Sequence, residues 1–287
     1  MDIIITGLLL GGTYALIAMG LTLQYGVARI MNLANGEMLV LGALAAFWVF
    51  TAQEISPYLT MLVAAPLAFA GNWAIYRLLM RPLVARAKSQ GQLEVDAILA
   101  TFGLSFALVG IMVSIHGEYF TYSYLAVPVE LFGDAFALNR VMAFVAAVVI
   151  CGGLWLWLMY TRQGMAVRAV SKSTEAAGLV GINVRFVSTL AFALGGAVTA
   201  VGGTLISSFL TLDASVGVIY TMKALIIVIM GGVGDIRGAV IAAVILGLVE
   251  TTVARLIDPG LTLVAAYAIF VLILLFRPQG LFGRRPT

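Results

Sequence analysis

Apolar runs long enough to cross a lipid bilayer recur along the whole sequence, and they limit what the chain can fold into. A helix of about 20 apolar residues covers the roughly 30 Å of hydrocarbon in a bilayer. Hydrophobic residues make up 62% of the chain and charged residues 10%, whereas a soluble domain is about half apolar and a quarter charged. The sequence therefore predicts an all-α, polytopic transmembrane helix bundle of about eight to ten spans. We place nine, over residues 3–27, 36–53, 58–79, 95–115, 141–160, 186–209, 216–231, 239–257 and 261–276.

The distribution of Lys and Arg predicts the orientation of these spans. Cytoplasmic loops of membrane proteins carry an excess of both residues. The N-terminus starts with Asp2 and lacks a basic leader segment, so we expect a retained first span. With the N-terminus outside and the C-terminus in the cytoplasm, only Arg140, Lys223 and Arg255 fall elsewhere. The inner loops then hold Arg29, Arg77, Arg81, Arg86, Lys88, Arg162, Arg168, Lys172, Arg185, Arg237, Arg277, Arg284 and Arg285.

Residues that support catalysis or metal binding are scarce. His116 is the only histidine and Cys151 the only cysteine, which excludes a His/Cys metal cluster and an intrachain disulfide. A membrane-embedded enzyme would need a nucleophile with a base, or a metal. The net charge of +3 lies in short loops and indicates no nucleic-acid surface. We therefore expect no catalytic residue, no metal site and no nucleic acid partner. Residues 1–287 are expected to form a single membrane domain surrounded by lipid.

A polar island, residues 162–185, separates two long apolar segments. It reads RQGMAVRAVSKSTEAAGLVGINVR and is predicted to form a helix over about 163–184, with Ser171 or Ser173 as a cap. One interpretation is an ordinary loop helix. The other is a coupling helix gripped by a cytosolic ATPase, in which Glu175 offers a charge. In that helix Ala176 and Ala177 would permit close approach of the ATPase, and Gly181 would permit a turn that a side chain disfavours. The coupling residues would be Ser171, Glu175, Ala176, Ala177 and Gly181.

A second polar stretch, Asn32-Leu33-Ala34-Asn35-Gly36-Glu37, follows the first apolar run. It is either an inner loop with Glu37 solvated at a helix start or a broken segment that lines a translocation path. Irregular backbone at membrane depth is tolerated only where protein or a cavity surrounds it. Asn32, Asn35 and Glu37 are therefore candidate path residues.

Three ionisable residues fall within or beside apolar runs. Lys223 either extends its ammonium group outward to the interface or pairs with Glu250 on another span. Arg255 follows Glu250 by five residues, a poor spacing for a pair on one helix face. Charges inside a membrane usually face protein or water, so Lys223 and Glu250 join the candidate path. Tyr14 in the first apolar run is a further polar candidate for it. Weaker candidates for its lining are Thr13, Thr101, Ser105, Thr204, Ser207 and Ser208.

The longest predicted outer loop, about residues 116–139, is rich in aromatic residues. These side chains either lie on the membrane surface or form a docking surface for a soluble partner outside the cell. The aromatic set is Tyr119, Phe120, Tyr122, Tyr124, Phe132 and Phe136.

Glu175-Ala176-Ala177-x-x-x-Gly181 resembles the EAA motif of ABC importer permeases, and the surrounding RAVSKSTEAAGLVGINVRFV is similar to branched-chain amino acid permeases of the LivH type. Three other stretches agree, in the same order along the chain: GLLLGGTYALIAMGLTLQYGVARIMNLANGE, GGVGDIRGAVIAAVILGLVE and FRPQGLFG. The resemblance covers nearly the whole chain. It departs from the family at Asn35, where a His is frequent, and at Asp235, where a Ser is frequent.

The resemblance implies the permease of a multi-pass importer in a bacterial inner membrane. Its partners would be a second, LivM-like permease, two LivG/LivF-like ATPase subunits and a periplasmic solute-binding protein. The solute would be a branched-chain amino acid, or the urea, amide or aromatic acid that related permeases serve. ATP and Mg²⁺ would be bound by the partner subunits. Residues 231–238 lack the Lys-Ser/Thr of a phosphate-binding loop, and we interpret them as a tight turn between two spans.

A self-contained secondary transporter or channel is the alternative function. That class favours paired intramembrane acids or an inverted repeat with two matched broken helices. Only residues 26–37 look broken in the sequence, which favours the ABC importer permease.

Overall fold

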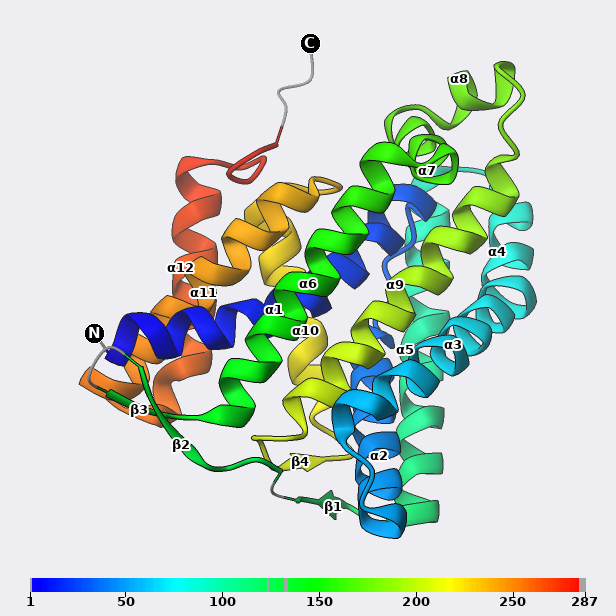
Figure 1. The fold of residues 1–287 in the computed structure, drawn as a ribbon. Helices are drawn as coiled ribbons and strands as arrows, with labels where there is room; N and C mark the ends of the chain where they lie inside the picture. Colours follow the sequence, from blue (N-terminus) through cyan, green and yellow to red (C-terminus); the bar gives the residue numbers. More distant parts are fainter. Residues whose placement is uncertain (1, 123, 132–133, 284–287) are drawn as a thin grey trace.

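The computed structural model describes residues 2–122, 124–131 and 134–283, and these form a helical bundle (Figure 1). The predicted loop residues Phe132, Arg284 and Arg285 lie outside this description. The predominance of helices confirms the predicted fold class. In chain order the elements are α1 (Asp2–Ala28), α2 (Asn35–Gln53), α3 (Pro57–Ile75), η1 (Tyr76–Met80), α4 (Arg81–Arg86), α5 (Gln90–His116), β1 (Tyr119–Phe120), β2 (Pro128–Leu131), β3 (Asp134–Ala137), α6 (Leu138–Tyr160), α7 (Arg162–Lys172), α8 (Thr174–Leu179), α9 (Val184–Ile206), β4 (Leu212–Asp213), α10 (Gly217–Gly231), α11 (Ile236–Leu256), η2 (Pro259–Leu261) and α12 (Thr262–Phe276).

Eight helices in the described part of the chain are long and apolar enough to cross a membrane. They are α1, α2, the continuous helix α3–η1–α4, α5, α6, α9, α11 and the unit η2–α12. The chain still traverses the bundle at the ninth predicted span, 216–231, from β4 to the turn before α11, but the helix there is shorter than a full crossing because α10 has 15 residues. At 1.5 Å per residue it reaches about 22 Å, short of the roughly 30 Å that a crossing requires.

Helices α1 and α9 form the centre of the bundle, and small residues let their neighbours approach closely. A Cβ atom on Gly7 or Gly11 of α1 would lie 2.8 Å from the Cα atom of Leu248 or Val244 in α11. Lipid provides no hydrophobic force between helices, so such close packing holds a membrane bundle together.

The two ends of the bundle differ in structure (Figure 1). At one end, β1 pairs with β4 and β2 pairs with β3, both antiparallel. We call this the strand end; it includes most of the predicted outer loop 116–139. Phe120 and Phe136 are buried there and Tyr119 is exposed, so the loop's aromatic residues do not all lie on one surface. At the other end, α7, α8 and the last described residues project from the bundle. We call this the α8 end.

The turn between α10 and α11 closes tightly at the α8 end of these helices. Gly232 has a φ of +104° and Gly234 a φ of +80°. The Asp235 carboxylate caps α11 by accepting a hydrogen bond from the Gly238 N–H at 3.0 Å. Leu281 N–H of the C-terminal tail donates to Met230 O at 2.7 Å. The tight turn predicted for 231–238 is confirmed.

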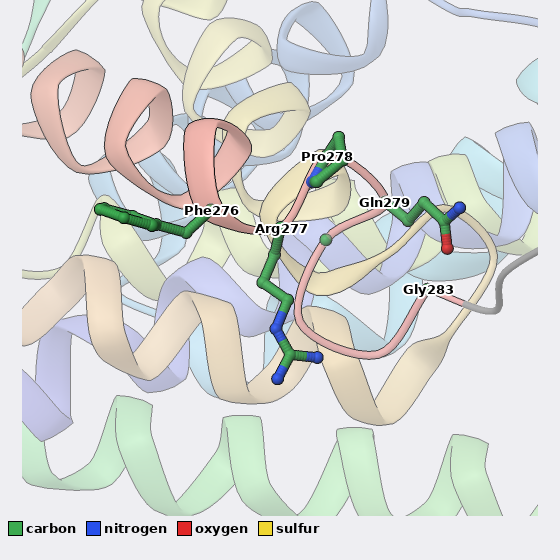
Figure 2. Close-up of a pocket in the computed structure, with 6 residues that line it drawn as sticks. Phe276, Arg277, Pro278, Gln279 and Gly283 are labelled. Carbon is green, nitrogen blue, oxygen red and sulfur yellow. The ribbon is translucent and has the colours of Figure 1, made fainter.

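The C-terminal tail leaves a cavity of about 360 Å³ where it folds back after α12 (Figure 2). The side chains of Arg277 and Gln279 point away from each other in this view. No member of the predicted path or coupling set borders the cavity, whose lining is Phe276, Arg277, Pro278, Gln279, Gly280 and Gly283.

We predict that Gly203→Ala lowers the thermal unfolding midpoint of the purified protein in detergent. Gly203 of α9 lies against α2, and its new Cβ would fall 2.7 Å from the carbonyl carbon of Leu39. Overpacking of this kind costs about 1–3 kcal/mol. Gly71→Ala in α3 is the matched control, because a Cβ there meets no atom within 4 Å. Equal midpoints for the two variants would show that α2 and α9 are not in backbone contact.

Candidate functional site

The connection between α1 and α2 is irregular and largely buried. Its backbone N–H and C=O groups therefore need hydrogen-bond partners that a helix would otherwise supply. Two threonines on other helices provide them. Thr101 of α5 accepts a hydrogen bond from Leu33 N–H at 3.1 Å. Thr221 of α10 donates to Leu33 O at 3.2 Å and accepts from Gly36 N–H at 2.8 Å. The solvated-loop interpretation of residues 32–37 is therefore wrong, and the segment is broken helix enclosed by protein.

The two asparagines of this segment face the centre of the bundle. Asn32 donates to the Gln24 side chain at 2.9 Å and accepts from Ala34 N–H at 3.0 Å. Asn35 accepts from the Thr199 hydroxyl of α9 at 3.2 Å. Both side chains thus hold the connection against α1 and α9. Neither contacts Glu37 through a hydrogen bond in the described part of the chain.

Glu37 is completely buried in the first turn of α2, with 0% of its surface exposed. Its Oε1 accepts a hydrogen bond from the Ser105 hydroxyl of α5 at 2.9 Å. Its Oε2 has no hydrogen-bond partner among the described residues. The carboxylate also touches the start of α10, since a Cβ on Gly217 would lie 2.6 Å from Glu37 Cδ. The N-terminal ends of two helices favour negative charge at this point.

Lys223, Glu250 and Tyr14 form a second buried polar cluster between α10, α11 and α1. Lys223 Nζ lies 2.8 Å from Glu250 Oε2 and 2.7 Å from Tyr14 Oη. Tyr14 Oη in turn donates to Glu250 Oε2 at 2.7 Å. The ammonium group also lies 4.8 Å from the centre of the Tyr14 ring and 5.9 Å from that of Tyr220. The prediction that the Lys223 ammonium group extends outward to the interface is therefore wrong, and the predicted pairing of Lys223 with Glu250 is confirmed.

Arg255 does not join this cluster, as its spacing from Glu250 predicts. Its guanidinium group forms an exposed ion pair with Asp2 at 2.9 Å. Arg255, Glu250 and Arg140 of α6 all border a cavity of about 420 Å³. The six predicted path residues thus separate into two groups. Tyr14, Lys223 and Glu250 meet in one cluster, whereas Asn32, Asn35 and Glu37 contact three different helices.

Most of the weaker lining candidates satisfy their own helix backbone. The hydroxyls of Thr13, Thr204 and Ser208 donate to carbonyls three residues earlier. Ser207 also bonds Tyr122 at 2.8 Å at the strand end, where burial raises the pKa of Tyr122 to about 12. Only Thr101 and Ser105 of that set touch the buried connection or Glu37. Sequence reasoning missed Thr199 and Thr221, whose one signal was a hydroxyl within an apolar run.

The polar island forms two helices, so the single helix predicted over 163–184 is wrong. Ser173 interrupts it with extended backbone between α7 and α8. Its side chain caps α8 by accepting from Ala176 N–H at 3.2 Å. Ser171 is not the cap, since its hydroxyl donates to Arg168 O at 2.9 Å inside α7.

Gly181 ends α8 in a left-handed turn, with a φ of +81°. Ile182 N–H bonds to Ala177 O and Gly181 N–H to Gly178 O, both at 3.1 Å. This is the Schellman pattern, which favours glycine at the left-handed position. The turn predicted at Gly181 is confirmed.

The side chains of α8 divide between the bundle and the solvent. Ala177 is buried in the cluster that joins α7 and α9, so its small side chain permits close packing within the bundle. Glu175 and Ala176 are exposed. Leu179 and Val180 are also exposed, by 89% and 76%. The tip of α8 thus presents apolar side chains beside one carboxylate.

Comparison with known proteins agrees with this geometry. The family described as branched-chain amino acid transport system, permease component, matches residues 3–276. The chain belongs to this family. LivH of Salmonella typhimurium, a permease of a high-affinity branched-chain amino acid transport system, is 29% identical over 97% of this chain and 94% of its own length. BraD of Pseudomonas aeruginosa, described in the same way, is 29% identical over 98% and 95%. The fructose import permease FruF of Bifidobacterium longum is 26% identical over 95% of this chain and 75% of its own length.

Family membership confirms the LivH-type resemblance drawn from the EAA motif and the three other stretches. It also confirms the expectation of a multi-pass transport subunit of an ABC import system rather than an enzyme. The alternative of a self-contained secondary transporter is set aside by the same finding.

We predict that Lys223→Met destabilises the permease by about 3–5 kcal/mol, because it leaves the Glu250 carboxylate buried without its cation. The double variant Lys223→Met/Glu250→Gln should recover most of that loss. Arg255→Gln is the matched control, and removal of this exposed pair costs at most about 1 kcal/mol. Unfolding by denaturing detergent measures all three. Additive effects in the double variant would contradict the ion pair.

Proposed function

We propose that this chain is the LivH-like permease of an ABC importer that translocates branched-chain amino acids across a bacterial inner membrane. Two LivG/LivF-like ATPases drive it, a LivM-like permease completes the membrane core, and a periplasmic binding protein delivers the solute. The names of the LivH and BraD relatives support this solute class. ATP and Mg²⁺ belong to the ATPases, since residues 231–238 form a turn between helices without the lysine of a phosphate loop.

The observation that carries the proposal is the projecting tip of α8. Leu179 and Val180 are large apolar residues left almost fully exposed at the end of the bundle, and Glu175 lies exposed on the same short helix. Exposed apolar side chains with a polar rim are typical of protein interaction sites. We propose that an ATPase subunit covers this tip. The α8 end is then cytoplasmic, and the strand end, with its N-terminus, faces outward to meet the binding protein.

The contacts of α8 with α9, and of α9 with α2, suggest how movement of the ATPases reaches the membrane helices. The Gly181 turn joins α8 directly to α9, the most deeply buried helix. A Cβ on Gly42 of α2 would lie 2.7 Å from the carbonyl carbon of Ala200 in α9. We propose that ATP binding displaces Ser171–Gly181 as a lever, and that α9 and α2 follow as one rigid unit. The lever works because the ATPases contact it differently in their two states.

We propose that the solute path runs beside α10, between the connection that carries Glu37 and the cluster of Lys223, Glu250 and Tyr14. Both groups are polar and buried, and the connection adds the irregular backbone that is found at the sites of many transporters. Asn32 and Asn35 contribute by holding the connection in place rather than by facing the solute.

The proposal predicts that this chain co-purifies with its ATPases and supports ATP-driven leucine uptake in proteoliposomes with the partner permease and binding protein. Leu179→Asp should abolish the complex, because it places a charge in the apolar contact. Leu179→Met keeps the apolar surface and is the matched control. If the complex survives Leu179→Asp, the ATPase binds at a surface other than the tip of α8. Fructose uptake in place of leucine uptake would assign the solute class of the FruF relative.

We also predict that Gly181→Ala reduces ATP-driven uptake, whereas Gly178→Ala does not. The left-handed backbone at Gly181 costs a non-glycine residue roughly 1–2 kcal/mol and so shifts the lever relative to α9. A Cβ meets no atom within 4 Å at either glycine, and only Gly181 has a positive φ. Uptake assays at equal amounts of assembled complex compare the two variants. Equal uptake would show that the turn geometry does not transmit the ATPase movement.

A further inference from the structure

Glu37 is a buried carboxylate with free capacity for a cation. Glu250, the other buried carboxylate, already holds the Lys223 ammonium group at 2.8 Å. In the described part of the chain no cationic side chain forms an ion pair with Glu37. Its Oε2 is fully buried and accepts no hydrogen bond from those residues. Glu250 Oε1 also lacks a hydrogen-bond partner among those residues, but its carboxylate already has a cation. Burial of an unpaired charge is costly, so Glu37 Oε2 is an open ligand position.

Glu37 is held on a rigid support. Close backbone contacts fix α2 against α9, where Gly42 meets Ala200 and Gly203 meets Leu39. At the start of α2, a Cβ on Gly36 would lie 2.6 Å from the carbonyl carbon of Gly217 in α10. Because backbone lies against backbone at these positions, rotation of α2 about its axis would bring side chains into the backbone of α9 and α10. The position of the carboxylate is therefore set before any ligand arrives.

Helix α5 covers Glu37 and is held more loosely. Its buried stripe is small or polar where it crosses the α1–α2 connection, at Ala97, Thr101 and Ser105. Its opposite face is apolar and exposed, as at Leu99 and Phe106. Side-chain hydrogen bonds attach it, from Thr101 and Gln90 to the connection and from Ser105 to Glu37. A shift of α5 opens the carboxylate without disturbing the packing between α2 and α9.

We infer that Glu37 binds the primary ammonium group of the transported amino acid once α5 moves aside, with Oε2 as the acceptor and Ser105 as the adjoining polar group. This inference rests on the proposed function for its solute class. An ammonium group supplies the positive countercharge that the Glu37 carboxylate lacks, and it can donate three hydrogen bonds. One charge-assisted contact retains the solute within the membrane without the several anchors that would prevent its release.

The probe is the reactivity of a cysteine beside the carboxylate. Ser105→Cys is made in a Cys151→Ala background, purified with its partner subunits, and treated with a methanethiosulfonate reagent. Leucine and 3-methylbutylamine, which keep the ammonium group, should slow the reaction about tenfold, as expected for a hydrogen bond to a charged group. 4-Methylpentanoate, which lacks that group, should not. Equal protection by 4-methylpentanoate, or protection by sodium or potassium chloride alone, would overturn the assignment.

Adding Glu37→Gln to the same protein provides the decisive control, because the amide keeps the shape and removes the charge. Protection by leucine and 3-methylbutylamine should disappear. Persistent protection would overturn the inference.

Transport gives an independent readout if Ser105→Cys does not assemble. Glu37→Gln in the otherwise native complex should lower leucine uptake by at least about tenfold, with Glu37→Asp retaining part of it. Glu54→Gln at the exposed far end of α2 is the matched control and should transport normally. Normal uptake by Glu37→Gln would overturn the inference, whereas absent leucine uptake by the native complex would contradict the proposed function instead.

Discussion

The structure depends on one constraint, which is that the backbone of the α1–α2 connection must find hydrogen-bond partners where lipid offers none. The hydroxyls of Thr101 and Thr221 meet this need from two other helices. Each hydroxyl therefore fixes a helix as well as a loop. Because an unsatisfied backbone group in hydrocarbon costs several kcal/mol, the positions of α5 and α10 follow from that of the connection.

The same constraint explains why α10 is short. Its first residue, Gly217, contacts Gly36 and Glu37 at the start of α2. Glu37 in turn bonds Ser105, eleven residues before α5 ends at His116. At 1.5 Å per residue, α10 therefore begins about 16 Å inside the end of α5. Two helix starts meet at this depth, and their N-terminal ends favour the carboxylate that lies between them.

Local pattern predicted the parts of this structure that local chemistry determines. Apolar length placed eight spans, and the spacing of Gly181 after the EAA motif predicted the turn that ends α8. The depth at which a helix begins within the bundle could not be predicted in this way, because contacts with residues far along the chain determine it. Residues 216–231 read as a full span because nothing in that run shows that Gly217 starts beside Glu37. Ala177 likewise belongs to a motif associated with a partner, yet its place on the helix turns it toward α7 and α9.

The two buried carboxylates constrain the helices in opposite ways. Lys223 forms an ion pair with Glu250 and a hydrogen bond to Tyr14, and these contacts hold α10 against α11 and α1. Moving α10 away would separate a buried ion pair, a change that costs several kcal/mol. Ser105 and Thr101 hold α5 to Glu37 and the connection by hydroxyl hydrogen bonds, which a solute or water can replace at less cost than separating a buried ion pair. Movement that exposes the polar interior to a solute therefore meets least resistance at α5, on the side where the carboxylate still has an oxygen to offer.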